Sequence, residues 1–207
     1  MVDTQVRPSD VTKFPIIDAM LSIPREEFVP ARLREAAYVG ENLEIGQGRT
    51  LLEPRTFAKM VDALDVQPHH VALDLGCGLG YSTAVLASLC EFVVAVEDDP
   101  ERAAEAQTLL SNHGIDNAAV MEGALPEGAA KSGPYDIIIV EGAVEEVPDA
   151  LLEQLREGGR IGCIFAEAAL GVVRIGYKID GVVNWRFSFN AGAPVLQGFR
   201  KAAAFSF

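Results

Sequence analysis

The sequence contains little cysteine, no long apolar run and few basic residues. Its three cysteines stand far apart and form no CxxC pair, so neither a disulfide framework nor a metal site such as a zinc site is expected. The longest uncharged stretch, residues 75–90, carries three glycines and is too short and polar for a membrane span. Seventeen basic residues stand against thirty acidic ones, a formal net charge of −13. A surface this acidic repels nucleic-acid phosphate and anionic membranes, so neither is expected as a partner.

The composition is that of an ordinary globular chain. Hydrophobic residues make up 49% of the 207 positions and charged residues 23%, which allows one sizeable core. The first twenty residues mix charges with single apolar positions and lack the apolar stretch of a secretory signal, so a cytoplasmic protein is expected. Repeats and linkers are absent from the sequence, which predicts a single domain over 1–207: a helical cap (1–65), a cofactor-binding core (66–165) and antiparallel C-terminal strands (166–207).

The hydrophobic pattern predicts an α/β fold with a doubly wound, mostly parallel sheet. Helices are expected in the cap over 16–21, 26–38 and 54–64. Core strands are expected over 71–75, 93–97, 118–122, 136–140 and 160–165, with helices over 82–89, 100–112 and 148–156 between them. The consecutive Ile137, Ile138 and Ile139 indicate a central strand that is buried on both faces. Asp180-Gly181 predicts a hairpin between strands 172–179 and 182–189, and aromatic residues including Phe205 and Phe207 suggest that the tail packs on the core or an edge.

A glycine-rich loop follows the first core strand and is the strongest site signal. It reads Asp74-Leu75-Gly76-Cys77-Gly78-Leu79-Gly80, between a strand and a helix, where glycines let a ligand approach the backbone and its free N–H groups. Tyr81 stands next, so the dinucleotide pattern GxGxxG is not met. The Asp74 carboxylate would repel a pyrophosphate and suits a positively charged methionyl group. The loop therefore favours S-adenosylmethionine over NAD.

Acidic residues end the second core strand. Glu97 is placed to accept hydrogen bonds from both ribose hydroxyls of a nucleoside lying across the strand ends, and Asp98 follows it directly. The alternative is that the glycines make only a tight turn and the acids are solvated. The ordered series of strand, loop, helix, strand and acid favours cofactor binding.

Several separate stretches resemble one family. They are Ile23-Pro24-Arg25-Glu26-Glu27-Phe28-Val29-Pro30, Leu43-Glu44-Ile45-Gly46 with Gly48 and Thr50, the glycine loop, Gly133-Pro134-Tyr135-Asp136, and Leu152-Glu153-Gln154-Leu155-Arg156-Glu157-Gly158-Gly159-Arg160. With these segments the chain resembles the protein-L-isoaspartate O-methyltransferases over residues 17–159. The resemblance implies a Rossmann-like methyltransferase fold, S-adenosylmethionine as cofactor, and methyl transfer to a carboxylate of a damaged aspartyl residue in a protein or peptide.

The chain departs from the family pattern at the substrate segment. The family's Thr-Ile-Ser-x-Pro reads Thr50-Leu51-Leu52-Glu53-Pro54 here, so the serine hydroxyl that meets the substrate carboxylate is missing. The resemblance places substrate binding on Arg49, Thr50, Leu51 and Leu52. We hypothesise that the Arg49 guanidinium, which can hold a carboxylate bidentately, replaces the hydroxyl.

Two further departures concern the cofactor and the reacting group. An acid that usually meets the adenine amino group is replaced by Gly123-Ala124, so backbone contacts would have to suffice. Where the family has a threonine, Glu141 ends the fourth core strand, close to the expected methyl position. The resemblance thus gives a cofactor set of Asp74, Gly76, Gly78, Gly80, Glu97, Asp98, Gly123, Ala124 and Glu141.

The chemistry leaves the catalytic residue open. A substrate carboxylate has a pKa near ~4 and is ionised at neutral pH, so no general base is required; Thr50 and Glu141 are the candidates for a catalytic role. If Glu141 accepted a proton, the substrate would instead be a small molecule with a hydroxyl or amine. Glu141 could equally bind the cofactor's ammonium group. The third alternative is a non-catalytic protein that binds the cofactor and acts through partners, which Leu52 and Ala124 favour.

Overall fold

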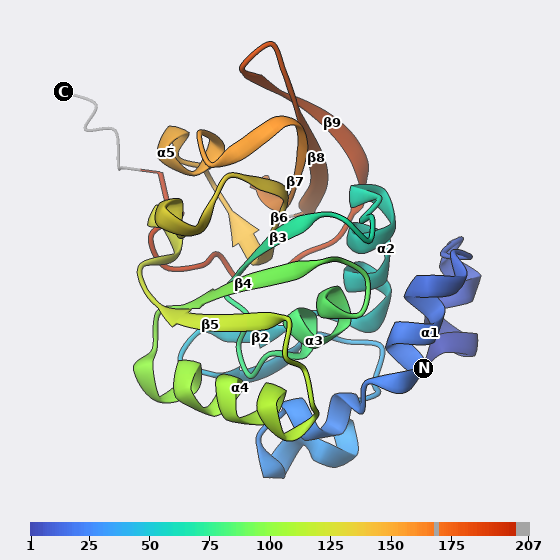
Figure 1. Cartoon of the computed structure of the whole chain (residues 1–207). Helices are drawn as coiled ribbons and strands as arrows, with labels where there is room; N and C mark the ends of the chain where they lie inside the picture. Colours follow the sequence, from blue (N-terminus) through green and yellow to red (C-terminus); the bar gives the residue numbers. More distant parts are fainter. Residues whose placement is uncertain (168–169, 202–207) are drawn as a thin grey trace, which may run out of the picture.

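The molecule is built on a seven-stranded sheet with helices against it (Figure 1). The computed structural model describes residues 1–167 and 170–201, so the expected packing of Phe205 and Phe207 lies outside the described residues. In spatial order the sheet runs β5-β4-β3-β6-β7-β8-β9. These strands are β3 (Val71–Leu75), β4 (Phe92–Glu97), β5 (Ala118–Glu122), β6 (Tyr135–Val144), β7 (Leu155–Glu167), β8 (Leu170–Ile179) and β9 (Val182–Asn190).

The strand order creates a switch point at the centre of the sheet. From β3 the chain moves outward through β4 to β5, then returns to place β6 on the other side of β3. The pairs among β5, β4, β3, β6 and β7 are parallel, whereas β8 and β9 add as antiparallel strands. The predicted doubly wound, mostly parallel fold is confirmed. At a switch point the loops leaving adjacent strands diverge and form a crevice at the carboxyl edge of the sheet.

Alternate residues of the central strands feed two hydrophobic clusters, one on each face of the sheet. Ile137 and Ile139 pack in the first cluster with residues of α1, α2, α3 and α4, while Ile138 packs in the second with the C-terminal residues Leu196 and Phe199. The helices are α1 (Phe14–Ser22), α2 (Pro54–Leu64), α3 (Tyr81–Ala87), α4 (Pro100–Asn112) and α5 (Asp149–Leu152). None of the described helices combines the length and apolar character that a bilayer crossing requires.

Three details of the secondary structure differ from the sequence-based expectation. The helix expected over 26–38 is two short 3-10 segments, Arg25–Phe28 and Ala31–Ala36, because the residue before Pro30 is held extended. The helix expected over 148–156 ends at Leu152, and β7 already begins at Leu155. Residues 43–51 form a small separate hairpin of β1 (Leu43–Gly46) and β2 (Arg49–Leu51), which was not expected.

The tail hairpin follows the prediction. Residues Asp180 and Gly181 link β8 to β9 with φ of 52° and 75°, the left-handed backbone that a two-residue hairpin turn of this kind requires.

Burial on both faces predicts a large cost for shortening the central strand. Ile138→Ala should lower the free energy of unfolding by roughly 2–5 kcal/mol, because it removes buried methylene groups and leaves a cavity. Ile179→Ala is the matched control, since Ile179 ends β8 with 49% of its surface exposed; it should cost less than about 1 kcal/mol. Urea denaturation of both variants measures the difference, and equal losses would contradict the two-sided core.

Candidate functional site

The glycine loop lies at the carboxyl edge of the sheet, between the end of β3 and the start of α3. Gly76, Gly78 and Gly80 all have left-handed backbone, with φ of 79°, 59° and 93°. A Cβ added at Gly78 would stand 2.7 Å from Cδ1 of Ile45 on the β1–β2 hairpin, so Ile45 would have to move, and the left-handed backbone would strain the new residue. The loop is therefore tightly covered by the hairpin.

Asp74 is fully buried at the end of β3, directly before the glycines. Its Oδ2 atom accepts hydrogen bonds from the Ser82 and Thr83 hydroxyls, both at 2.7 Å, while Oδ1 has no protein partner. Burial raises the pKa of this carboxyl to about 6, although the two hydroxyls act in the opposite direction. One carboxylate oxygen of Asp74 is thus left available to a ligand.

Glu97 ends β4 and is also fully buried, but its carboxylate is completely engaged. Gly78 of the glycine loop donates its backbone N–H to Oε2 at 2.9 Å, and Asp98 donates its own to Oε1 at 3.1 Å. Arg49 binds the carboxylate through Nε and Nη2 at 3.0–3.2 Å. Nε of Arg102, in the first turns of α4, lies 3.2 Å from Oε1.

Arg49 therefore holds acids of the protein itself. Its guanidinium is 3% exposed and bridges Glu97 to Asp98, whose Oδ1 atom lies 2.5 Å from Nη2. The two acids raise the pKa of Arg49 against the opposing effect of burial, which is the largest single influence. The negative charges of Glu97 and Asp98 are thus balanced by the positive charges of two arginines, Arg49 and Arg102. The proposed role of Arg49 at a substrate carboxylate stays a prediction.

Glu141 lies in β6 beside the same edge, where the register between β6 and β7 breaks between Ile139 and Ala143. Its side chain is buried and Oε1 has no partner. Burial raises the pKa of Glu141 well above its ordinary value, the nearby Asp74 charge adds to the rise, and Arg25 opposes it. Arg25 is itself fully buried: it donates to the backbone oxygens of Ala37 and Leu52 and stacks over the Tyr81 ring at 4.8 Å.

The substrate segment predicted from the sequence is buried. Thr50 and Leu51 belong to β2, and the side chain of Leu52 lies in the hydrophobic core with its carbonyl bound by Arg25. Glu53 accepts a hydrogen bond from the Thr56 hydroxyl at the start of α2. Arg49 is the one member of the segment whose side chain reaches the acids at the strand ends.

The predicted adenine loop does meet this edge. Gly123 follows β5 and donates its N–H to the backbone oxygen of Glu97 at 3.0 Å, and Ala124 begins the next 3-10 turn. The structure thus gathers Asp74, the glycines, Glu97, Asp98 and Gly123 at one edge, with Glu141 on the neighbouring strand.

A C-terminal segment, residues 194–199, completes the site and was not found from the sequence. It runs beside the end of β6, with Ala143 bonded to Pro194 and Leu196 through backbone hydrogen bonds of 2.9 Å. The Leu196 side chain fills the space between Gly142 and Gly76, since added Cβ atoms there would meet it at 2.6 and 3.5 Å. No local pattern predicts this pairing of distant residues. Arg102, by contrast, could have been found from its position four residues after Asp98, near the start of a helix.

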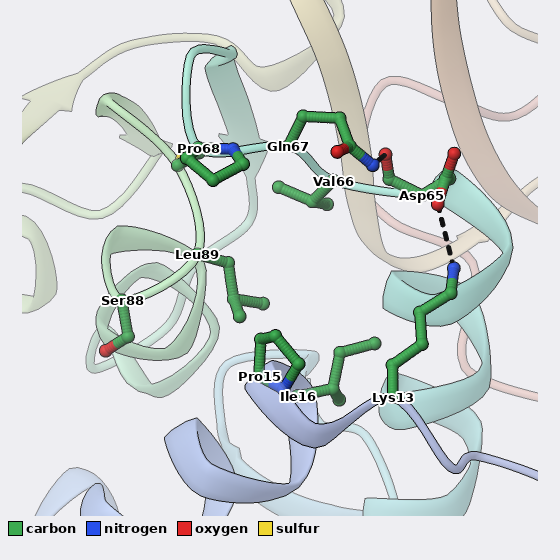
Figure 2. A pocket seen from close by; sticks show the side chains of 10 residues that line it. Lys13, Pro15, Ile16, Asp65, Val66, Gln67, Pro68, Ser88 and Leu89 are labelled. Atoms are coloured by element: carbon green, nitrogen blue, oxygen red, sulfur yellow. Dashed lines mark hydrogen bonds and ion pairs between the residues drawn. The ribbon is translucent and has the colours of Figure 1, made fainter.

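Two of the hollows in the structure bear on where a ligand could bind. The larger, about 540 Å³, lies at the amino edge, between the start of α1, residues 65–68 and the end of α3, and the Lys13–Asp65 ion pair borders it (Figure 2). It contains none of the predicted site residues. A smaller hollow of about 340 Å³ lies at the carboxyl edge, lined by Gln47, Gly48, Arg49, Asp98, Val195, Gln197, Gly198 and Arg200.

Comparison with known proteins gives a consistent result. The model of the protein-L-isoaspartate(D-aspartate) O-methyltransferase family matches residues 3–166. A protein-L-isoaspartate O-methyltransferase of Koribacter versatilis is 40% identical over 161 residues, which are 78% of this chain and 72% of the relative. Another, of Vibrio parahaemolyticus, is 38% identical over 183 residues, 88% of each chain.

Solved structures agree on the fold. A protein-L-isoaspartate O-methyltransferase superposes with a TM-score of 0.81 at 25% identity, covering 93% of this chain and 63% of its own length. A Plasmodium falciparum protein of the same kind, solved in complex with S-adenosyl-L-homocysteine, has a TM-score of 0.79 at 20% identity and covers 92% of this chain and 94% of its own.

The buried Glu141 predicts a pH dependence of stability. Its raised pKa means that the folded state holds the proton more tightly than the unfolded state, so this carboxyl increasingly destabilises the fold as pH rises above about 4.5. Glu141→Gln removes the titration and should increase the free energy of unfolding at pH 8, with little change at pH 4.

Urea denaturation at the two pH values measures this effect. Glu146→Gln is the matched control, because Glu146 lies on the exposed surface of the same segment and should change stability by less than about 0.5 kcal/mol at either pH. A loss of stability in Glu141→Gln at pH 8 would show instead that Glu141 is an anion held by Arg25.

Proposed function

Because the chain belongs to the protein-L-isoaspartate(D-aspartate) O-methyltransferase family, we propose that it is an S-adenosylmethionine-dependent enzyme that methylates a carboxylate of damaged aspartyl residues. The observation that carries the proposal is the meeting of Asp74, the glycine loop and Glu97 at one carboxyl edge beside the switch point. The substrate is a damaged protein or peptide, and we place the activity in the cytoplasm, as expected from the sequence.

The residues present suit the cofactor in chemical kind. Two buried carboxylate oxygens without partners, Oδ1 of Asp74 and Oε1 of Glu141, are suited to receive the N–H groups of the methionyl ammonium. Glu97 stands where ribose hydroxyls would donate, and Gly123 and Ala124 offer backbone groups to adenine. When bound, S-adenosylmethionine supplies a methyl group on a positively charged sulfonium.

The residues of this chain contribute by aligning the substrate carboxylate with the methyl group and by excluding water from the site. A substrate carboxylate is ionised at neutral pH and needs no base, so the protein has to hold it in line in a desolvated position. Thr50 is buried on β2, next to Arg49, and remains the hydroxyl candidate for this task. Burial raises the pKa of Glu141 well above its ordinary value, and a raised pKa is also what a carboxyl acting as a general base needs. A small molecule with a hydroxyl or amine therefore stays the alternative substrate.

Disturbing the glycine loop should abolish methyl transfer. With labelled S-adenosylmethionine and an isoaspartyl peptide, Gly78→Ala should lower the rate at least about tenfold, since the new methyl group meets Ile45 and shifts the amide that Glu97 holds. Gly114→Ala is the matched control: Gly114 has the same left-handed backbone, φ 69°, but nothing within 4 Å of an added Cβ. It should keep the rate within about twofold.

The label distinguishes the alternatives. Methyl groups that mild base releases, on the isoaspartyl peptide and not on its ordinary aspartyl counterpart, would support carboxyl methylation. If the protein binds S-adenosylhomocysteine but labels neither peptide, the repair function is wrong and a non-catalytic binding protein becomes the better account.

A further inference from the structure

The carboxylate expected to bind ribose already has a full set of donors from the protein. A carboxylate offers about four lone-pair positions, and Glu97 receives two from backbone N–H groups and two from Arg49. Glu97 is 0% exposed and the Arg49 side chain 3%. A ribose diol therefore cannot reach Glu97 while Arg49 stays in place.

The guanidinium and the ribose diol are chemically alike in one respect. Each presents two neighbouring donors to the two oxygens of one carboxylate, and the guanidinium adds a positive charge. Arg49 also lies against the glycine loop, since a Cβ at Gly76 would stand 3.6 Å from Nη1. The arginine thus meets Glu97 with the same two-donor pattern that a ribose diol would offer.

We propose that Arg49 is an internal ligand of the ribose subsite, which must leave Glu97 before S-adenosylmethionine or S-adenosylhomocysteine can bind. The inference rests on the proposed function for the identity of the ligand. Arg49 then competes with the cofactor's ribose for Glu97, and this competition lowers the affinity for the cofactor.

The fold permits this exchange at small cost to the main sheet. Arg49 begins β2, and β1 and β2 form a separate two-stranded sheet, so moving the arginine breaks no ladder of the seven-stranded sheet. The Asp98 side chain is partly exposed, at 27%, and lines the 340 Å³ hollow together with Arg49. After leaving Glu97, the guanidinium of Arg49 can lie in this hollow and keep its ion pair with Asp98. Arg102 stays beside Glu97, so the buried carboxylate keeps a positive charge next to it.

Titration with S-adenosylhomocysteine by calorimetry tests the proposal. Arg49→Gln removes the charge and the two-pronged contact, and its Kd should be at least about tenfold lower than that of the unaltered protein. Arg49→Lys keeps a charge for Glu97 and Asp98 but loses the bidentate geometry, so it should bind with intermediate affinity and gives a variant less prone to misfold. Arg7→Gln, which removes an exposed arginine paired with Asp3, is the matched control and should leave the Kd unchanged.

A measurement on the unaltered protein avoids any folding defect of the variants. Phenylglyoxal modifies accessible arginines, and mass spectrometry locates the product. Saturation with S-adenosylhomocysteine should raise the rate of modification at Arg49 at least severalfold, because the ligand releases it from burial. An unchanged or slower rate would overturn the exchange.

The outcomes separate this inference from the function on which it rests. If Arg49→Gln binds no tighter than the unaltered protein and methyl transfer is intact, the inference is overturned and the function stands. Tighter binding by Arg49→Gln with no transfer to an isoaspartyl peptide would support the inference and overturn the repair function. Absence of binding by both proteins would overturn both.

Discussion

A buried carboxylate needs hydrogen-bond donors, and the way Glu97 obtains them organises this molecule. Removing a charge from water is unfavourable unless other groups replace the lost hydration. Glu97 draws its donors from the glycine loop and from the β1–β2 hairpin through Arg49, and it forms an ion pair with Arg102 of α4. One side chain thereby fixes the relative positions of three segments that are far apart in the sequence.

At the other end of the site, Asp74 and Glu141 are buried carboxyls that lack a full set of protein donors. Burial raises the pKa of both Asp74 and Glu141, the charge of Asp74 adds to the rise at Glu141, and each carboxyl keeps one oxygen without a protein partner. Such unsatisfied groups are uncommon in folded proteins, and a water, an ion or a ligand can supply the missing partner. The site is therefore saturated at Glu97 and unsaturated at Asp74 and Glu141, so its two ends differ in what a ligand gains by binding.

How far the sequence predicts this structure depends on the range of the interactions involved. The central strand could be predicted from Ile137–Ile139, and the glycine loop and Glu97 from their order along the chain, because strand patterns and strand-end positions are local properties. The break in the helix expected over 26–38 could also have been predicted, because a proline at position 30 disfavours helical backbone at the residue before it. Arg49 could be named from the sequence, but its partners depend on the β1–β2 hairpin, which only three-dimensional packing reveals. Residues 194–199 pair with β6 across fifty positions of sequence, so no local pattern indicated them.

The path of residues 194–199 over the strand ends also bears on how such a protein can change over evolutionary time. Leu196 packs on Gly76 and Gly142 from outside the parallel part of the sheet, and Arg49 of the β1–β2 hairpin also lies against Gly76. Ligand preference can therefore be altered by substitutions in two peripheral segments while the sheet, the glycine loop and their folding remain as they are.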